Sequence, residues 1–331
     1  MGRARGLESP VPAGTPEEMG GQYGRLMRPA LQALSSYARC VLSAERLERF
    51  LEYGRRHERV LPEEIRRQLR AMAGAGGIDY DQLVAMNVTP RLLCSALATW
   101  GPATPDGAMI LGRNGDYFGL GVDDCGNLLV AYHPTAGRPV LLVSFLGMAG
   151  GFAGMNDAGV AFGNLLVFNS SGWRDDGLPV QLAMRLAAQT APTAPDMVAR
   201  LTGMNHAIPN NVIVADPREA FVAELGTQRS HVRRGADGVL AVTNDFLEHP
   251  VRFEAARCPR FDALTAQAAK NAGRMTVETM KEALFAAARR DMNIQATVCE
   301  PAAMRMHVSI NQKPASAGPY VTLDVAGMLA K

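Results

Sequence analysis

The stretch CSALATWGPATPDGAMILGRNGDYF, which begins at Cys94, constrains the fold of this chain more than any other. Two apolar runs rich in strand-forming residues flank a segment with two prolines, an aspartate and a glycine, and this order predicts a β-hairpin. The predicted strands are residues 94–100 and 108–114. Because a hairpin returns its second strand to the start of its first, we expect Arg113 and Asp116 beside Cys94. A thiol, a guanidinium and a carboxylate in one small volume form a candidate catalytic site.

Composition and charge exclude several classes of partner. The chain has 331 residues, of which 47% are hydrophobic, and this is enough for a large core in one or two domains. The net charge of +2 is close to neutral, so we expect neither nucleic acid nor an anionic membrane surface as a partner. No run of eighteen apolar residues occurs, so no integral membrane segment is expected.

The sequence does not decide the cellular compartment of the protein. The start, MGRARGLESPVPAG, has two arginines but no apolar stretch after them, so it is not a secretory signal as it stands. The sequence as given indicates a cytoplasmic protein, whereas a signal peptide trimmed from it would make the protein secreted or periplasmic.

The cysteines and histidines do not form metal or disulfide motifs. Five cysteines and six histidines are scattered along the chain without a CxxC pair or an HExxH motif. We therefore expect no disulfide framework, no metal site and no cofactor. The glycine-rich segment 147–154, GMAGGFAG, lacks the Lys-Ser/Thr of a phosphate loop and is interpreted as a turn near the site.

The first 93 residues have a helical pattern. Thr15, followed by a proline and two glutamates, is a good helix start, and apolar residues recur at helical spacing as far as Tyr37. Three more helices are predicted at residues 44–56, from 62 to the glycines at 74–77, and at 83–87.

From residue 94 onward, strand patterns dominate. Further strands are predicted at 127–133, 140–146, 152–155, 160–168, 212–215, 220–225, 239–243, 296–299, 304–310 and 320–325, with helices at 179–190, 194–201, 261–272 and 277–290. Blocks of strands separated by pairs of helices indicate the α+β class. We divide the chain into a helical N-terminal segment, residues 1–93, and a catalytic domain, residues 94–331.

Several motifs together resemble those of one family. They are Cys94-Ser95, WGPATPDG at 100–107, GRNGD at 112–116, GMNDAGVAFGN at 154–164 and VTN at 242–244. In this combination the chain resembles the N-terminal-nucleophile (Ntn) hydrolases with a cysteine nucleophile. More narrowly, it is similar to the acyl-CoA:6-aminopenicillanic acid acyltransferase-like family (peptidase family C45), with the bile-salt (choloylglycine) hydrolases as more distant relatives.

The resemblance implies a fold, a maturation step and a reaction. The fold would be an αββα four-layer sandwich of antiparallel sheets, preceded by a helical pro-segment. The bond between Leu93 and Cys94 would be cut autocatalytically, and the pro-segment would stay bound as a non-covalent subunit. The reaction would hydrolyse or transfer the N-acyl group of a small-molecule linear amide. Whether the chain forms a homo-oligomer stays open. Leu93 and Asp245 depart from the family, in which glycine and a histidine or small residue are common at these positions.

The chemistry of the three hairpin residues fits this reaction. A thiol is a good nucleophile as the thiolate, so it needs a neighbouring base or positive charge. Cleavage before Cys94 would give the residue an α-amino group with an ordinary pKa of about 7.7–8.0, which supplies a base next to the sulfur. We expect Asp116 to orient this amine and Arg113 to favour the thiolate. The alternatives are an inert core cysteine and a structural Arg–Asp pair.

Two asparagines are candidates for stabilising the oxyanion of the tetrahedral intermediate. Asn244 matches a T-N pair of the family, so the resemblance makes its amide the first candidate. Asn164 is the second, and a structural hydrogen bond explains it equally well. Asn156 is assigned to a hairpin turn, and Glu224 and Arg260 are interpreted as structural.

The substrate and the alternative functions stay open at this stage. Tyr117, Phe118, Phe152 and Phe246 form either an apolar acyl pocket or part of the core. Two other functions fit the same fold, namely a phospholipase B-like lipid amidase or hydrolase, and an uncleaved, catalytically silent Ntn-like binding protein.

Overall fold

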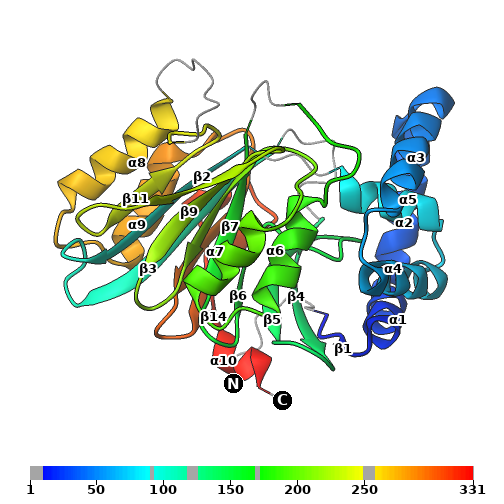
Figure 1. Cartoon of the computed structure of the whole chain (residues 1–331), viewed down its shortest axis with the longest axis horizontal. Helices are drawn as coiled ribbons and strands as arrows, with labels where there is room; N and C mark the ends of the chain where they lie inside the picture. Colours follow the sequence, from blue (N-terminus) through cyan, green and yellow to red (C-terminus); the bar gives the residue numbers. More distant parts are fainter. Residues whose placement is uncertain (1–9, 90–92, 118–125, 168–171, 249–257, 331) are drawn as a thin grey trace.

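Two sheets packed face to face form the centre of the fold, and helices cover both outer sides (Figure 1). The computed structural model describes residues 10–89, 93–117, 126–167, 172–248 and 258–330. The α+β class and the αββα order of layers agree with the expectations from the sequence.

The first sheet has eight strands, and all but one pair of neighbours are antiparallel. In spatial order these are β1 (Ala13–Gly14), β4 (Asn127–Pro134), β5 (Val140–Phe145), β6 (Ala153–Asn156), β7 (Ala161–Leu166), β8 (Asn210–Ala215), β9 (Ala220–Leu225) and β10 (Ser230–Arg234). Short β1 runs parallel to β4, so the N-terminal segment contributes a strand to this sheet.

The second sheet has six antiparallel strands and contains the predicted hairpin at its centre. In spatial order these are β11 (Val239–Val242), β2 (Leu93–Gly101), β3 (Gly107–Asp116), β12 (Asn293–Glu300), β13 (Arg305–Ile310) and β14 (Val321–Asp324). The hairpin is confirmed as β2–β3, and the prolines and glycine between the strands form its turn.

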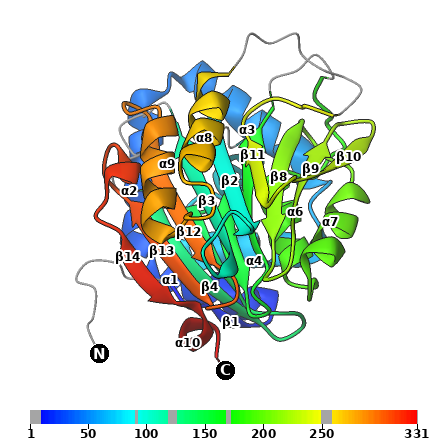
Figure 2. The ribbon, with the colours of Figure 1, turned by 90° about the vertical axis from the view of Figure 1, so that its left-hand side faces the viewer.

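Helices cover the outer face of each sheet. The first sheet carries α6 (Val180–Ala188) and α7 (Ala194–Thr202), and the second carries α8 (Pro259–Lys270) and α9 (Val277–Ala287), which Figure 2 shows in front of β2 and β3. The short 3₁₀ helix η1 (Ala315–Ala317) and helix α10 (Val325–Leu329) complete the C-terminal part.

Alternation along the strands divides the apolar residues into separate cores. In β2, Cys94, Ala96 and Ala98 face the first sheet, whereas Leu97 faces α8 and α9. Because side chains of a strand alternate between its two faces, one strand contributes to both layers. This alternation places the Cys94 side chain in the layer between the two sheets.

Besides β1, the described part of the N-terminal segment has five helices. Figure 1 shows them in blue to cyan at one end of the molecule. They are α1 (Pro16–Leu26), α2 (Arg28–Val41), α3 (Ala44–Glu58), α4 (Glu63–Gly76) and α5 (Tyr80–Val88). Thr15 caps α1 in a capping box, as the sequence predicts. The apolar faces of α1 and α4 share one core with β4, β5 and α6. Leu93 is the first residue of β2, so the expected boundary between residues 93 and 94 falls inside a strand.

The structure differs from the sequence-based prediction at four places. The helical pattern from Thr15 to Tyr37 is divided at Met27, because Pro29 has no backbone N–H to continue one helix. Strand β10 was not predicted, since its sequence SHVRR is polar and it lies at an edge of the sheet, where apolar alternation is not required. Strand β1 and helix α10 are too short to give a sequence pattern.

Along the described parts of the chain, no helix combines the length and the apolar character needed to cross a membrane.

Candidate active site

The β2–β3 register decides which predicted residues meet. Cys94 lies opposite Gly115, and Leu93 lies opposite Asp116. Cys94 and Arg113 both point into the space between the sheets, whereas strand alternation assigns Asp116 to the outer face, toward α8 and α9. The hairpin therefore brings the three groups to one end of the sheet, but the carboxylate lies on the other face from the sulfur.

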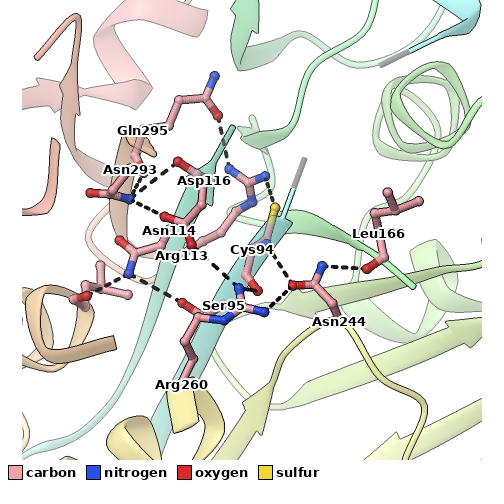
Figure 3. Close-up of polar contacts among 12 residues, drawn as sticks. Cys94, Ser95, Arg113, Asn114, Asp116, Leu166, Asn244, Arg260, Asn293 and Gln295 are labelled. Carbon is pink, nitrogen blue, oxygen red and sulfur yellow. Dashed lines mark hydrogen bonds and ion pairs between the residues drawn. The ribbon is translucent and has the colours of Figure 1, made fainter. Parts of the chain in front are cut away.

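The Cys94 sulfur is in direct contact with Arg113. Arg113 Nη2 donates to Cys94 Sγ at 2.9 Å, and both side chains are buried (Figure 3). The guanidinium is fixed by Asn164, whose backbone oxygen accepts from Nε at 3.1 Å, and by Gln295, whose Oε1 accepts from Nη1 at 3.1 Å. Gly163 leaves room for this side chain, since a Cβ at that position would lie 2.5 Å from Arg113 Cδ.

Two opposing effects act on the thiol. Burial raises the pKa of the Cys94 thiol above its ordinary value, and the positive charge of Arg113 acts against this without overcoming it. The surroundings of Cys94 therefore favour a neutral thiol. The guanidinium is already in place to stabilise the thiolate when the sulfur loses its proton.

Asp116 is buried and is held by residues other than Arg113. Asn293 Nδ2 donates to Asp116 Oδ1 at 3.0 Å, and Arg260 Nη1 lies 3.6 Å from Asp116 Oδ2. Burial raises the pKa of Asp116 to about 6, although Asn293, Arg260 and Arg113 all favour its ionised form. The structural alternative of a simple Arg113–Asp116 pair does not describe this arrangement, because the carboxylate pairs with Arg260 instead.

Arg260 was interpreted as structural from the sequence, and in the structure it contacts the main chain of Cys94. Its Nη1 donates to Cys94 O at 2.8 Å, and its Nη2 donates to Asn244 Oδ1 at 2.7 Å. Because Nη1 also faces Asp116, one guanidinium links the Cys94 main chain to the carboxylate on the outer face. A signal was present, since Arg260 lies in the first turn of α8, where a cation is unfavourable for the helix dipole unless it has another partner.

Asn244 contacts the Cys94 main chain. Its Oδ1 accepts from Cys94 N at 3.0 Å, and its Nδ2 donates to Leu166 O (Figure 3). The hydrogen bonds support this orientation of the Asn244 amide, because two donors face its oxygen and a carbonyl oxygen faces its nitrogen. The amide nitrogen has two hydrogens, and Leu166 uses one of them. Its expected role as an oxyanion donor stays a prediction.

The remaining predicted polar residues fall into two groups. Asn164 lies against Arg113, and its Nδ2 donates to Asn210 Oδ1 at 3.4 Å, so it belongs to the surroundings of the thiol. Asn156 holds its own turn by accepting from Val160 N and donating to Ala188 O, which confirms its assignment to the hairpin. Glu224 pairs with Arg233 in the first sheet.

Strand β12 supplies a support that the sequence analysis missed. Gln295 uses both ends of its amide, because Oε1 accepts from Arg113 and Nε2 donates to Asn127 Oδ1 at 2.8 Å. Asn293 holds Asp116 and accepts from Ser316 N at 2.7 Å. Both amides are fully buried, and buried amides require hydrogen-bond partners.

The aromatic candidates that the structure describes are buried or pack against a core. Phe152 belongs to the core between the sheets, the same layer as Cys94. Its ring packs edge-on against the Phe145 ring, with 5.0 Å between the ring centroids. The centroid of the Phe145 ring lies 6.2 Å from that of the Tyr117 ring. Phe246 is buried as well, while Phe118 lies outside the described residues. Within the described part of the chain, no cluster of three or more histidines, cysteines or carboxylates has a geometry that could hold a metal ion.

Comparison with known sequences identifies a family for this chain. A sequence model of the family described as acyl-coenzyme A:6-aminopenicillanic acid acyl-transferase matches residues 103–312, more than half of the chain. A curated relative, an uncharacterized protein from Archaeoglobus fulgidus, is 25% identical over 240 residues, which cover 61% of this chain and 40% of that protein. The chain thus spans less than half the length of this relative.

Comparison with solved structures identifies the same fold. The Caenorhabditis elegans ortholog of N-acylethanolamine-hydrolyzing acid amidase superposes with a TM-score of 0.51 at 16% identity, covering 63% of this chain and 93% of that chain. Penicillin V acylase from Agrobacterium tumefaciens gives a TM-score of 0.47 at 15% identity, covering 66% and 83%. The likeness to the nematode structure shows an Ntn-hydrolase fold.

Proposed function

Because the chain belongs to the acyl-coenzyme A:6-aminopenicillanic acid acyl-transferase family, we propose that it is a cysteine amidase or acyltransferase with Cys94 as its nucleophile. It attacks the carbonyl carbon of an N-acyl amide, forms an S-acyl enzyme at Cys94, and passes the acyl group to water or to an amine. The observation that carries this proposal is the 2.9 Å contact between Arg113 Nη2 and Cys94 Sγ in a buried site. A guanidinium held on a sulfur favours the thiolate that acyl transfer requires.

Maturation comes first in this proposal. The Cys94 thiol attacks the Leu93 carbonyl carbon, an S–C bond forms, the C–N bond breaks, and the thiol proton ends on the new α-amine. Water then hydrolyses the thioester, which frees the thiol and leaves residues 1–93 with a C-terminal carboxylate. The position of Cys94 N marks where the amine would lie, since in the uncut chain this atom is still a peptide amide.

After cleavage the amine serves as the base. Asn244 Oδ1, which accepts from the amide of the uncut chain at 3.0 Å, would accept from the amine and direct its lone pair. Asp116 acts on the amine from the outer face, partly through Arg260, and favours its protonated form. Asn244 Nδ2 has a second hydrogen, which we assign to the oxyanion, with Asn164 as the second candidate.

One observation favours a second candidate function. The thiol is completely buried in the uncut chain and its pKa is raised, as expected for an uncleaved and catalytically silent binding protein. The proposal of a lipid-directed amidase or phospholipase B-like hydrolase differs from the first in its substrate. Activity assays with N-acyl amides and with glycerophospholipids distinguish the lipid-directed enzyme from the amidase or acyltransferase proposed first.

The decisive experiment is the intact mass of the purified protein. We expect two chains, residues 1–93 and 94–331, in place of the 35.4 kDa precursor, with the new N-terminus at Cys94. Cys94→Ala should remain whole and inactive. Cys299→Ala is the matched control, because Cys299 is another buried free cysteine in the same core and should leave cleavage unchanged. An uncut wild-type chain that hydrolyses amides would contradict the maturation step, and an uncut chain without activity would favour the silent protein.

A further inference from the structure

A cavity of about 280 Å³ lies between the N-terminal helices and α6. One wall comes from the start of α1 and from α4, and the other comes from the end of β4 and from α6, which Figure 1 shows beside the N-terminal helices. Its lining includes neither Cys94 nor the residues that contact it. The volume is close to the lower end of the range typical of small-molecule sites, roughly 300–1,000 Å³.

A buried guanidinium lines this cavity. Arg185 of α6 is 2% exposed, its Nη1 donates to Ala149 O at 2.7 Å, and its Cζ lies 3.8 Å from the centre of the Tyr132 ring. No hydrogen-bond acceptor among the described residues faces its Nε, and no described carboxylate forms an ion pair with it. Burying a charge without a counterion is unfavourable, so this position requires a reason.

A second donor lies one helical turn further on. Gln189 follows Arg185 by four residues, so both lie on the same side of the helix end, and both line the cavity. Gln189 is 8% exposed, and its Nε2 also has no acceptor within the described parts of the chain. Both unpaired atoms are donors, so a complementary ligand must supply acceptors.

We propose that this cavity binds a small oxyanion, either a carboxylate or a phosphate, through Arg185 and Gln189. A planar guanidinium matches two oxygens of such a group, and a charge-assisted hydrogen bond is stronger than a neutral one. Because the walls belong to both the N-terminal segment and the catalytic domain, the bound oxyanion stabilises the contact between them by mass action. The site is independent of the reaction proposed at Cys94.

Glu64 places a negative charge at the wall of this cavity. It is an exposed carboxylate on α4 that lines the same cavity, and its charge acts on Arg185. An anion that enters must approach this negative charge. Glu64→Gln should therefore strengthen the binding of phosphate several-fold, with a smaller gain for the singly charged acetate.

Calorimetric titration of the full-length Cys94→Ala chain at constant ionic strength tests the proposal, with sodium phosphate and sodium acetate as the probes. We expect saturable binding to one site by at least one probe, and the pattern across the two identifies the oxyanion. Gln189→Leu should weaken this binding on the order of tenfold, and Arg185→Met should abolish it. Arg218→Met removes an exposed arginine outside the cavity and should leave the affinity unchanged.

Two results would overturn the proposal. One is the absence of saturable binding by both probes, and the other is an affinity that Gln189→Leu leaves unchanged. If Arg185→Met does not fold, Gln189→Leu and Glu64→Gln together decide, because they must shift the affinity in opposite directions. An unchanged affinity in both variants would place the anion elsewhere on the surface.

Discussion

Asp116 should make the stability of the uncut chain depend on pH. Its carboxyl is buried with a pKa of about 6, compared with an ordinary value of 3.8. Between these two values the folded state binds more protons than the unfolded state, so stability falls as the pH rises through this window and levels off above it. The full difference of about two units corresponds to about 3 kcal/mol, and about 1 kcal/mol of it falls between pH 5 and pH 7.

Asp116→Asn tests this value without relying on absolute stability. The comparison is made in the Cys94→Ala background, where the chain should stay uncut, by urea unfolding at several pH values. The free energy of unfolding of the Asp116→Asn variant should rise relative to its parent by about 1 kcal/mol from pH 5 to pH 7. The constant effect of removing the partner of Arg260 does not alter this slope. Asp106→Asn, an exposed aspartate at the other end of the hairpin, is the control. Parallel curves for Asp116→Asn and its parent would refute a raised pKa at this position.

Three further substitutions test the surroundings of the thiol in the cleaved enzyme that we propose. Asn244→Ala should lower kcat by about 10²–10³ if its amide supplies an oxyanion donor, and a kcat near that of the wild type would remove it from the site. Gly163→Ala should displace Arg113, because the new Cβ would lie 2.5 Å from Arg113 Cδ, and kcat should fall by about 10²; an unchanged kcat would mean that Arg113 can move without loss. Gln295→Leu removes one acceptor of the Arg113 guanidinium, so it should shift the pH–rate profile as well as kcat, whereas a purely structural role would lower the melting temperature alone.

The local part of the site could be predicted from the sequence, because its residues are close together in the chain. Turn chemistry between two apolar runs is enough to predict the β2–β3 hairpin, and the hairpin alone brings Arg113 to Cys94. Strand alternation was available too, and it would have assigned Asp116 to the opposite face from the sulfur. The prediction that the three groups share one volume used only their nearness along the hairpin. It did not take into account on which face of the sheet each side chain lies.

The distant part of the site could not be predicted in this way. The contact between Arg260 and Cys94 O spans 166 positions, and the one between Gln295 and Arg113 spans 182. No local pattern states that β12 pairs with β3 or that α8 begins above β2. A buried amide in an apolar strand indicates that partners exist, but the fold decides which ones.

The glycine-rich segment 147–154 shows how the N-terminal helices contact the rest of the chain. Asn87, at the end of α5, is fully buried, and it donates to Gly147 O at 2.9 Å and accepts from Ala149 N at 2.7 Å. Tyr23 of α1 accepts from Gly147 N at 2.9 Å. Side chains of the N-terminal helices thus satisfy backbone groups at the start of this segment, before β6 begins at Ala153.

The hydrogen bonds from Asn87 to Gly147 and Ala149 predict that this residue holds the N-terminal helices against the rest of the chain. Asn87→Ala would leave two buried backbone groups of the turn without partners, at about 1–3 kcal/mol each, so we expect a total loss of about 2–6 kcal/mol. Urea unfolding of the Cys94→Ala chain measures this loss, and Gln32→Ala, an exposed position in the same N-terminal segment, should change stability by less than about 0.5 kcal/mol. In a cleaved protein the same substitution should release residues 1–93 at a lower urea concentration than in the wild type. A loss for Asn87→Ala as small as that of the control would mean that apolar packing of α1 and α4 holds the segment without this amide.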